Sequence, residues 1–167
     1  MTQIYGGLIL ERLCLRFQPV SRILALMPAP SAPTPARLDL VRAGFEAIRT
    51  RDIDSLLELY TDDASFLPLT GTRVESGGYL GHAGIREYFV EMAEVWEEID
   101  PYADEVREQG DTVVAVGGCH VRGRASGAEA DTPMAWVYRL RDGLISSLHA
   151  FATAEEAFAA AGIGDAS

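Results

Sequence analysis

Residues 49–69, RTRDIDSLLELYTDDASFLPL, constrain the fold most, because their hydrophobic pattern changes period within a few residues. Asp52 stands where the N-cap of a helix would lie. Apolar residues follow it at helical spacing, namely Ile53, Leu56, Leu57 and Tyr60. The acidic pair Asp62–Asp63 interrupts that spacing, and the apolar run Ala64–Leu69 is typical of a strand. The sequence therefore predicts a short helix that turns into a strand, with a sheet downstream on which the helix packs.

Two further helices are predicted on either side of this stretch. The first begins at Arg37 and places four apolar residues on one face, Leu38, Val41, Phe45 and Ile48. The other spans residues 81–99 and is amphipathic, with glutamates on one side and, on the opposite side, Ile85, Tyr88, Phe89, Met92 and Trp96. Before it, the glycine-rich segment Thr70–Gly78 is predicted to be a loop and is the candidate for a lid, and Tyr79–Leu80 is a candidate short strand.

Downstream of this helix the hydrophobic period becomes that of strands, which are predicted over residues 102–108, 112–122, 132–141 and 144–151. Pro101 favours an edge position or a bulge in the first of them. Asp142–Gly143 predicts a tight hairpin turn. The capping box Thr153-x-x-Glu156 starts a final helix that runs through Ala161. Helices followed by an antiparallel meander and a closing helix predict an α+β fold.

Composition excludes several classes of function. The formal net charge is −11 and the isoelectric point is near 4.6, so the chain repels nucleic acid and anionic membrane surfaces, and neither is expected as a partner. All 14 basic residues are arginine, which leaves no lysine for a Schiff base or a phosphate-binding loop. The two cysteines, Cys14 and Cys119, support neither a disulfide framework nor a cysteine zinc site, and no metal or cofactor is expected. A reducing cytoplasm is the expected location.

Residues 1–36 differ from the remainder in charge and composition. Arginines outnumber acidic residues there, whereas the rest of the chain is strongly acidic, and the segment ends in the proline- and alanine-rich run MPAPSAPTPA. We expect a disordered, dispensable extension and linker, with Met27 as an alternative start. Residues 37–167 are expected to form a single domain, because their length is enough for one hydrophobic core.

Three local patterns taken together resemble the nuclear transport factor 2-like superfamily, in its SnoaL-like and ketosteroid-isomerase-like branch. They are D-I-D-S-L-L-E-L-Y-T-D-D-A-S-F at Asp52–Phe66, G-H-A-G-I-R-E-Y-F at Gly81–Phe89, and R-L-R-D-G-L-I-S-S-L-H-A-F at Arg139–Phe151. The resemblance covers residues 37–162. It implies a conical α+β barrel in which a curved, mainly antiparallel sheet wraps around helices, as in cystatin-like folds. It also implies an internal pocket and a homodimer formed through the outer face of the sheet.

The resemblance indicates that ketosteroid isomerase chemistry is absent. Such isomerases use a carboxylate base and an oxyanion hole made from a tyrosine and a protonated carboxylic acid. By alignment, the tyrosine falls on Gly44, the base on Pro68 and the protonated acid on Trp136. Glycine and proline have no side-chain proton to give, and an indole N–H donates a hydrogen bond but accepts none.

Two other chemistries of this fold also lack their residues. Relatives of limonene epoxide hydrolase hold a water between two aspartates aligned by an arginine, and these positions fall on Cys119, Ala150 and Gly117. The acid/base aspartate of SnoaL-type cyclases falls on Ala150 as well. The water or substrate would therefore have no base at these positions.

Other residues remain candidates for catalysis. His120 and His149 lie on strands expected to line or back the pocket, and a histidine near neutral pKa could act as a general base together with Tyr138. The other interpretation is structural, because if Cys119 and Ala150 point inward, strand alternation turns both histidines outward to the dimer face. Cys119 is either a nucleophile with a lowered pKa or, as is common for a buried thiol, inert.

The expected pocket residues are mostly aromatic: Tyr60, Phe66, Tyr88, Trp96, Cys119, Met134, Trp136, Tyr138 and Leu148. Such a wall is typical of a site for a small, largely apolar molecule. We therefore favour a binding domain that lacks the known catalytic residues of its relatives. One alternative is an isomerase, polyketide-cyclase-like or epoxide-hydrolase-like enzyme of the same fold that uses an acid/base such as His149. Another is a dimerisation module with a collapsed pocket. The direction of His149 and the size of the cavity distinguish these hypotheses.

Overall fold

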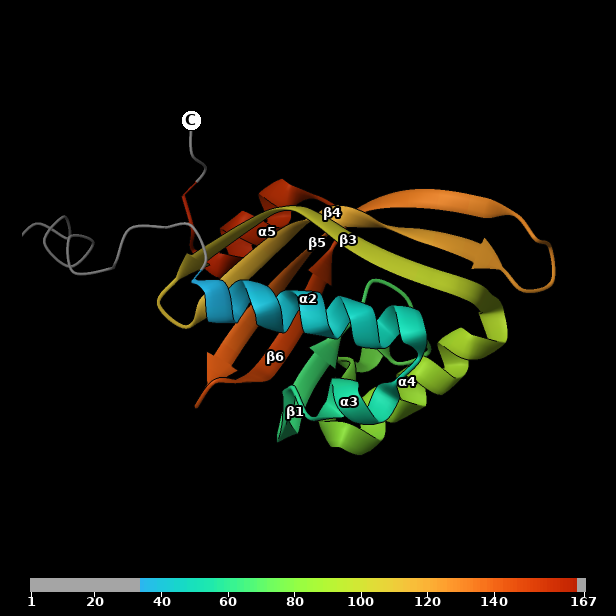
Figure 1. The fold of residues 1–167 in the computed structure, drawn as a ribbon, viewed down its shortest axis with the longest axis horizontal. Helices are drawn as coiled ribbons and strands as arrows, with labels where there is room; N and C mark the ends of the chain where they lie inside the picture. The colour runs from blue at the N-terminus through green and yellow to red at the C-terminus, as the bar shows by residue number, and fades with distance from the viewer. Residues whose placement is uncertain (1–33, 165–167) are drawn as a thin grey trace, which may run out of the picture.

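The computed structural model describes residues 34–164 and shows an open, curved sheet with helices on both of its faces (Figure 1). In chain order the elements are α2 (Pro35–Thr50), α3 (Ile53–Leu57), β1 (Tyr60–Leu67), the 3-10 turn η1 (Val74–Ser76), β2 (Tyr79–Leu80), α4 (Gly81–Val95), β3 (Trp96–Gln109), β4 (Thr112–Gly123), β5 (Glu129–Arg141), β6 (Leu144–Phe151) and α5 (Ala154–Ala161). The strand order is β2-β1-β6-β5-β4-β3, and only β1 and β6 pair in parallel among these strands. The predicted α+β fold is confirmed, although β2 and β3 are free edges and the cone is not closed.

The helices divide between the two faces of the sheet (Figure 1). We call the face that packs against α2, α3 and α4 the inner face, and the face that packs against α5 the outer face. The larger hydrophobic core lies on the inner face and takes alternate residues of the central strands, such as Val113 and Trp136. The residues next to them, Val114 and Val137, belong to a smaller core on the outer face with Phe158 of α5. The alternation of a β-strand thus supplies both cores from the same sequence.

The organising stretch forms the expected helix and strand, but the boundary between them is earlier than predicted. Asp52 caps α3 by accepting a hydrogen bond from the Ser55 N–H at 3.1 Å. Helix α3 then ends at Leu57, and Tyr60 is already in β1 rather than on the helix. Asp62–Asp63, which interrupt the helical spacing, lie within β1 as exposed residues. The register of β1 against β6 shifts between Tyr60 and Ser65. Because the strand is irregular there, two consecutive carboxylates can both be solvated within it.

The predicted helix over residues 81–99 is wrong in its last turn. Helix α4 ends at Val95, and Trp96 adopts an extended conformation with φ −110° and ψ 130°. Strand β3 begins there and pairs with the end of β4, for example Ile99 with Val121. The guanidinium of Arg51, which follows α2, donates hydrogen bonds to the carbonyls of Trp96 at 2.8 Å and Glu97 at 2.6 Å. Strand pairing and these two bonds therefore override the helical spacing of the segment.

The strand and hairpin predictions are confirmed with longer strands. Asp142 and Gly143 both have positive φ, +54° and +82°, as a type I′ hairpin turn requires. Strand β3 lies at the edge of the sheet, which explains how it contains Pro101, a residue with no N–H to donate. The predicted capping box starts α5, because Thr153 Oγ1 accepts a hydrogen bond from the Glu156 N–H at 3.2 Å.

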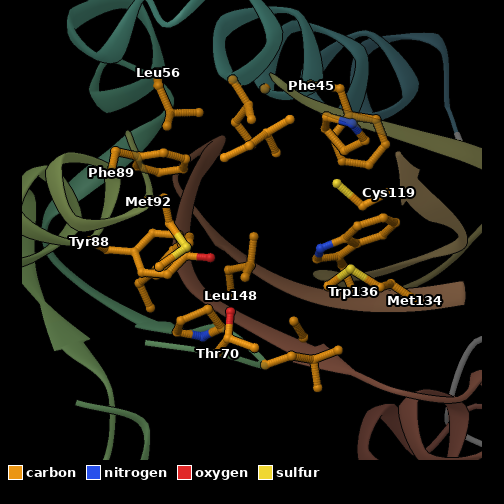
Figure 2. Close-up of a pocket in the computed structure, with 18 of the residues that line it drawn as sticks. Phe45, Leu56, Thr70, Tyr88, Phe89, Met92, Cys119, Met134, Trp136 and Leu148 are labelled. Atoms are coloured by element: carbon orange, nitrogen blue, oxygen red, sulfur yellow. The ribbon is translucent and has the colours of Figure 1, made fainter. Parts of the chain in front are cut away.

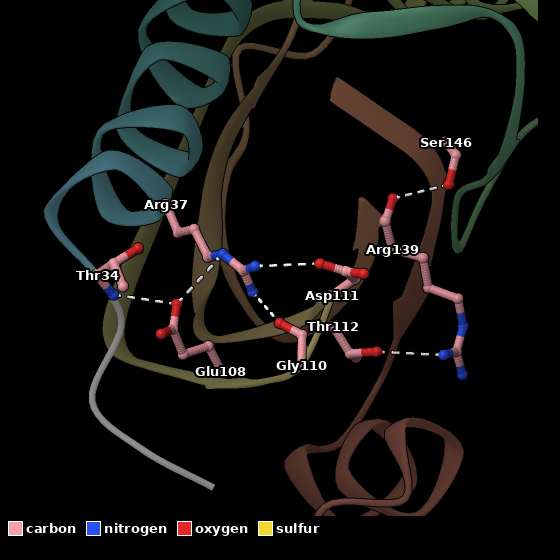
Figure 3. A network of polar contacts seen from close by, with 8 residues as sticks. All are labelled: Thr34, Arg37, Glu108, Gly110, Asp111, Thr112, Arg139 and Ser146. Carbon is pink, nitrogen blue, oxygen red and sulfur yellow. Dashed lines mark hydrogen bonds and ion pairs between the residues drawn. The ribbon is translucent and has the colours of Figure 1, made fainter. Parts of the chain in front are cut away.

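A polar network fixes the start of α2 to the β3–β4 hairpin (Figure 3). Glu108 is only 9% exposed, and its carboxylate accepts the Thr34 N–H at 3.0 Å while lying 3.5 Å from Arg37 Nε. Arg37 also donates to the Gly110 carbonyl and pairs with Asp111 at 3.2 Å. The helix that forms one wall of the molecule is therefore attached to the sheet at its first turn.

The start of the domain differs slightly from the predicted boundary at residue 37. Pro35 and Ala36 already form the first turn of α2, where proline is favoured because its missing N–H needs no partner. The rest of the predicted extension, residues 1–33, and residues 165–167 lie outside the described residues. Within residues 34–164, no helix is long and apolar enough to cross a membrane.

Candidate functional site

A cavity of about 230 Å³ lies between the inner face of the sheet and the helices α2 and α4 (Figure 2). Strand alternation explains its far wall, because every second residue of β5 from Ala130 to Tyr138 lines it. Leu148 and Ala150 do the same from β6, and Cys119 and Val121 from β4. Most of the lining atoms belong to aliphatic and aromatic side chains, so the cavity is an apolar pocket bordered by the larger core.

The structure places all nine predicted pocket residues in the wall of this cavity: Tyr60, Phe66, Tyr88, Trp96, Cys119, Met134, Trp136, Tyr138 and Leu148. Their aromatic rings also contact other rings in the wall. Phe45 and Trp136 have ring centroids 5.0 Å apart, and Phe66 and Tyr88 are separated by the same distance. Whether these residues contact a ligand stays a prediction.

Sequence reasoning missed part of the wall, mainly the contributions of the helices and of the loop before β2. The additional lining residues include Leu40, Phe45, Ile48, Phe89, Met92 and Thr70. Most of these were predicted on apolar helix faces, which was the available signal. Helical spacing shows that such residues turn away from solvent, but it does not distinguish those that pack tightly from those that face a cavity.

A few polar atoms interrupt this apolar wall. Figure 2 shows the hydroxyls of Tyr88 and Thr70, the indole nitrogen of Trp136 and the sulfur of Cys119 directed toward the same space. The cavity is therefore apolar over most of its surface, with isolated hydrogen-bonding groups on opposite sides.

The ionisable groups of the wall are all held in their neutral forms. Burial raises the pKa values of Tyr60, Tyr88 and Tyr138 above the ordinary value of 10.0. Burial also raises the pKa of the Cys119 thiol to about 11, the opposite of what a nucleophilic cysteine needs. Among the described lining residues there is no carboxylate, imidazole or guanidinium. At neutral pH the cavity therefore contains no charged side chain and no ready general base.

The two candidate histidines do not line the cavity. His149 is exposed, lies between the cavity-lining Leu148 and Ala150, and stacks its ring on Phe151 with centroids 4.0 Å apart. Its pKa is lowered by partial burial. His120 is likewise absent from the lining, although its neighbour Cys119 is in it. The candidate partner Tyr138 is in the wall, so the structure does not bring it together with either histidine.

The positions aligned with the catalytic residues of related enzymes are, with one exception, in the cavity wall. Gly44, Pro68 and Trp136 line it, as do Cys119 and Ala150. The exception is Gly117. A Cβ at this position would lie 2.2 Å from the Tyr102 carbonyl oxygen, so the backbone there leaves no room for a side chain. The residues at these five positions line the cavity and carry no group that acts as a base near neutral pH.

The candidate lid, Thr70–Gly78, is attached to α4 through two glutamates. Glu91 accepts hydrogen bonds from the Thr72 hydroxyl at 2.8 Å, the Thr72 N–H at 3.3 Å and the Tyr79 hydroxyl at 2.8 Å. These bonds, first of all the one from the Thr72 hydroxyl, lower the pKa of Glu91. Arg73 pairs with Glu87 at 2.8 Å. The loop that contributes Thr70 to the cavity wall is therefore attached to the helix by exposed polar bonds.

No metal centre is evident in the part of the chain that the structure describes. Across residues 34–164, no group of three or more histidine, cysteine, aspartate or glutamate side chains is arranged to hold a metal ion. His82, the remaining histidine, has its Nε2 3.0 Å from the Tyr60 carbonyl and serves to attach α4 to β1.

The sequence of this domain matches a known family. The family model for the SnoaL-like domain matches residues 41–148, which is more than half of the chain. The chain belongs to the SnoaL-like domain family. In this SnoaL-like domain, the matched region contains nearly the whole cavity wall, and Leu40 and Ala150 lie just outside it.

Several solved structures have a similar fold. An NTF2-like protein of unknown function from Burkholderia pseudomallei K96243 is 21% identical with a TM-score of 0.64, and the match covers 77% of this chain and 98% of that one. TerC, co-crystallised with polyporic acid, is 25% identical with a TM-score of 0.61 and coverage of 75% and 97%. RV0760c from Mycobacterium tuberculosis, in complex with estradiol-17beta-hemisuccinate, is 15% identical with a TM-score of 0.60 and coverage of 73% and 97%. No curated protein is significantly similar to the chain in sequence.

Proposed function

We propose that this SnoaL-like domain binds a small, largely apolar molecule in its inner cavity and performs no acid/base chemistry on it. The observation that carries the proposal is the uncharged wall. A cavity of about 230 Å³ inside an aromatic core favours an apolar occupant. Its ionisable groups, phenols and a thiol with raised pKa values, cannot accept a proton efficiently near neutral pH.

The similar structures support a cavity that takes ring compounds. TerC was crystallised with polyporic acid, and RV0760c with a steroid hemisuccinate. The wall of this chain offers comparable aromatic surface, including the ring pair Phe45 and Trp136. We infer that the natural ligand contains at least one ring and that aromatic stacking contributes to its binding.

The position of His149 argues against the alternative of an enzyme that uses it. A general base must lie within hydrogen-bonding reach of the substrate proton. His149 is on the outer face, separated from the cavity by the sheet itself, and its exposed ring stacks on Phe151. The same separation applies to His120.

The test is a pair of variants on two successive residues of α2. Gly44 lines the cavity, and a Cβ there would meet only Leu59, at an ordinary distance of 3.8 Å. Gly44→Met should therefore fold at least as stably as the wild type, because methionine is a better helix former, and should occupy the cavity. Ala43→Met, at an exposed position, is the matched control.

Binding is measured by isothermal titration calorimetry with 2-ethylnaphthalene as the probe. The wild type and Ala43→Met should bind it equally. Gly44→Met should bind it at least tenfold more weakly, because the methionine side chain takes up apolar surface that the probe would otherwise bury. Absence of binding to the wild type, or unchanged binding to Gly44→Met, would show that the cavity is not the proposed site.

We also propose that the domain is a cytoplasmic homodimer that pairs through the outer face. Helix α5 covers only part of that face, and β3, β4 and β5 extend beyond it (Figure 1). Tyr102 lies there 38% exposed, with its ring over Gly118 and its hydroxyl bonded to Asp131 at 2.8 Å. Cys119 forms no disulfide within residues 34–164, which agrees with a reducing compartment. Sedimentation velocity of the full chain tests the dimer, and a monomer at micromolar concentration contradicts it.

A further inference from the structure

One hydrogen-bond donor in the cavity has no partner among residues 34–164. Trp136 is 7% exposed, and Figure 2 shows its indole nitrogen directed into the cavity. No side chain or carbonyl among residues 34–164 accepts a hydrogen bond from this N–H. An indole N–H can only donate a hydrogen bond. A ligand that contacts this nitrogen is therefore best matched to it by an acceptor atom.

The opposite side of the cavity carries a different polar group. The hydroxyls of Tyr88 and Thr70 face the same space as the Trp136 nitrogen. Each hydroxyl has one hydrogen to donate and lone pairs that accept. This side can donate or accept, whereas the Trp136 side only donates.

The remaining polar groups favour an uncharged ligand. The hydroxyls of Tyr60 and Tyr138 belong to side chains that are both 4% exposed, and they are close enough that ionisation of one would oppose ionisation of the other. The described wall contains no arginine or histidine to balance an anion and no carboxylate to balance a cation. An ion entering this cavity would lose its hydration without gaining a partner of opposite charge.

We propose that the ligand is an uncharged ring compound with a carbonyl or ether oxygen that accepts the Trp136 N–H, and that Trp136 selects such compounds over hydrocarbons of the same shape. This inference rests on the proposed function, because it assumes that the cavity binds a small molecule. A second oxygen on the far edge of the ring would contact the hydroxyls of Tyr88 and Thr70.

Three probes of matched shape test the selection. They are 2-acetylnaphthalene, which has a ketone oxygen, 2-ethylnaphthalene, which replaces it with hydrogen atoms, and 2-naphthoate, which carries a negative charge. The wild type should bind the ketone roughly fivefold to tenfold more tightly than the hydrocarbon, the range expected for one hydrogen bond. It should bind the naphthoate more weakly than the ketone by a factor of roughly 100 or more.

Trp136→Phe keeps an aromatic ring and removes the N–H. In this variant the preference for the ketone over the hydrocarbon should fall to about one, while the hydrocarbon is still bound. Met134→Leu, two residues earlier on the same strand, changes the wall without removing a donor and should keep the wild-type preference. If Trp136→Phe does not fold, the test uses the ratio of ketone to hydrocarbon affinity in the wild type and in Tyr88→Phe. Tyr88→Phe should keep most of the ketone preference, because it leaves the Trp136 N–H in place.

The outcomes separate this inference from the proposed function. Equal binding of ketone and hydrocarbon to the wild type, or an unchanged ratio in Trp136→Phe, overturns the inference and leaves the proposed function standing. Tight binding of 2-naphthoate overturns the requirement for an uncharged ligand. Binding of none of the three probes overturns both.

Discussion

The two faces of the sheet are built from the same strands, yet the spaces beside them differ in character. On the outer face, small residues such as Val114, Ala135 and Val137 pack with Phe158 of α5, and the hollow beside them, of about 170 Å³, is lined in part by polar residues such as Arg139 and Ser147. On the inner face, larger residues such as Trp136 and Tyr138 point toward α2 and α4 and still leave a cavity of about 230 Å³. A larger side chain therefore does not ensure a filled core. The distance at which the covering helix is held decides whether the space closes.

The inner helices are attached to neighbouring elements by polar contacts at or near their ends. Arg37 and Glu108 attach the first turn of α2 to the β3–β4 hairpin, and Arg51, just after its last turn, holds the start of β3. Glu91 attaches α4 to the loop before β2. A chain that keeps an apolar pocket of about 230 Å³ gives up stability that a filled core would provide, which agrees with a binding role.

The largest expected effect comes from introducing the same negative charge on the inner and on the outer face of the sheet. Ala150→Asp puts a carboxylate at a 4% exposed position in the uncharged cavity wall, and should lower the free energy of unfolding by about 4 kcal/mol at pH 7. His149→Asp, one residue earlier on the exposed outer side, should change it by less than about 0.5 kcal/mol. Urea denaturation measures both variants.

The effect of Ala150→Asp should also depend on pH. Burial raises the pKa of the introduced carboxyl in the folded state, so the folded form prefers it protonated. The loss of stability should therefore be greatest at neutral pH and shrink as the pH is lowered toward the carboxyl range. Equal losses for the two aspartate variants would show that the inner wall is as solvated as the outer face.

A smaller test removes a phenyl ring from each face. Phe158→Ala leaves a hole in the smaller outer core and removes the ring beneath the Arg107 guanidinium, 4.7 Å away, so it should cost about 3 kcal/mol. Phe45→Ala removes a half-buried ring that already borders empty space, and should cost about 1 kcal/mol. A larger loss for Phe45→Ala than for Phe158→Ala, in the same urea measurement, would contradict the contrast between the outer and the inner core.

The smallest expected effect concerns the titration of His149. Partial burial lowers its pKa below 6.5, so the folded state favours the neutral ring. Its contribution to stability is present above pH 6.5 and is lost as the pH falls through the lower folded-state value. NMR titration should show this depressed pKa, and a saturating cavity probe should leave it unchanged because the ring lies on the other face. A shift on adding the probe would place His149 in contact with the ligand.

Much of the fold was readable from the sequence, because its signals are local. Asp52 as a cap, Asp142–Gly143 as a turn and the alternation of β4 to β6 each depend on a few neighbouring residues, and the structure confirms them. The errors lie where distant contacts override local pattern. Trp96 has helical spacing but pairs with Gly123 and has its carbonyl bound by Arg51, so it is extended.

The residues that line the cavity were easier to predict on the strands than on the helices. Strand alternation has a period of two, so placing Ala150 inward also places His149 outward, as the structure shows. Phe45 and Phe89 were recognised only as apolar helix positions. Their place in the wall depends on how far α2 and α4 stand from the sheet, which end contacts such as Arg37 with Glu108 determine and which no local pattern records.

The attachment of the loop at Glu91 has a consequence for kinetics. Thr70 belongs to the cavity wall, and two residues later Thr72 is bound to Glu91, so a molecule leaving past this loop would leave only as fast as those bonds open. Residence time would then be set by the loop and not by affinity alone. Because the Glu91 pKa lies below its ordinary value of 4.5, the carboxylate would keep these hydrogen bonds at neutral pH. Ligand release past the loop would become faster only in acid.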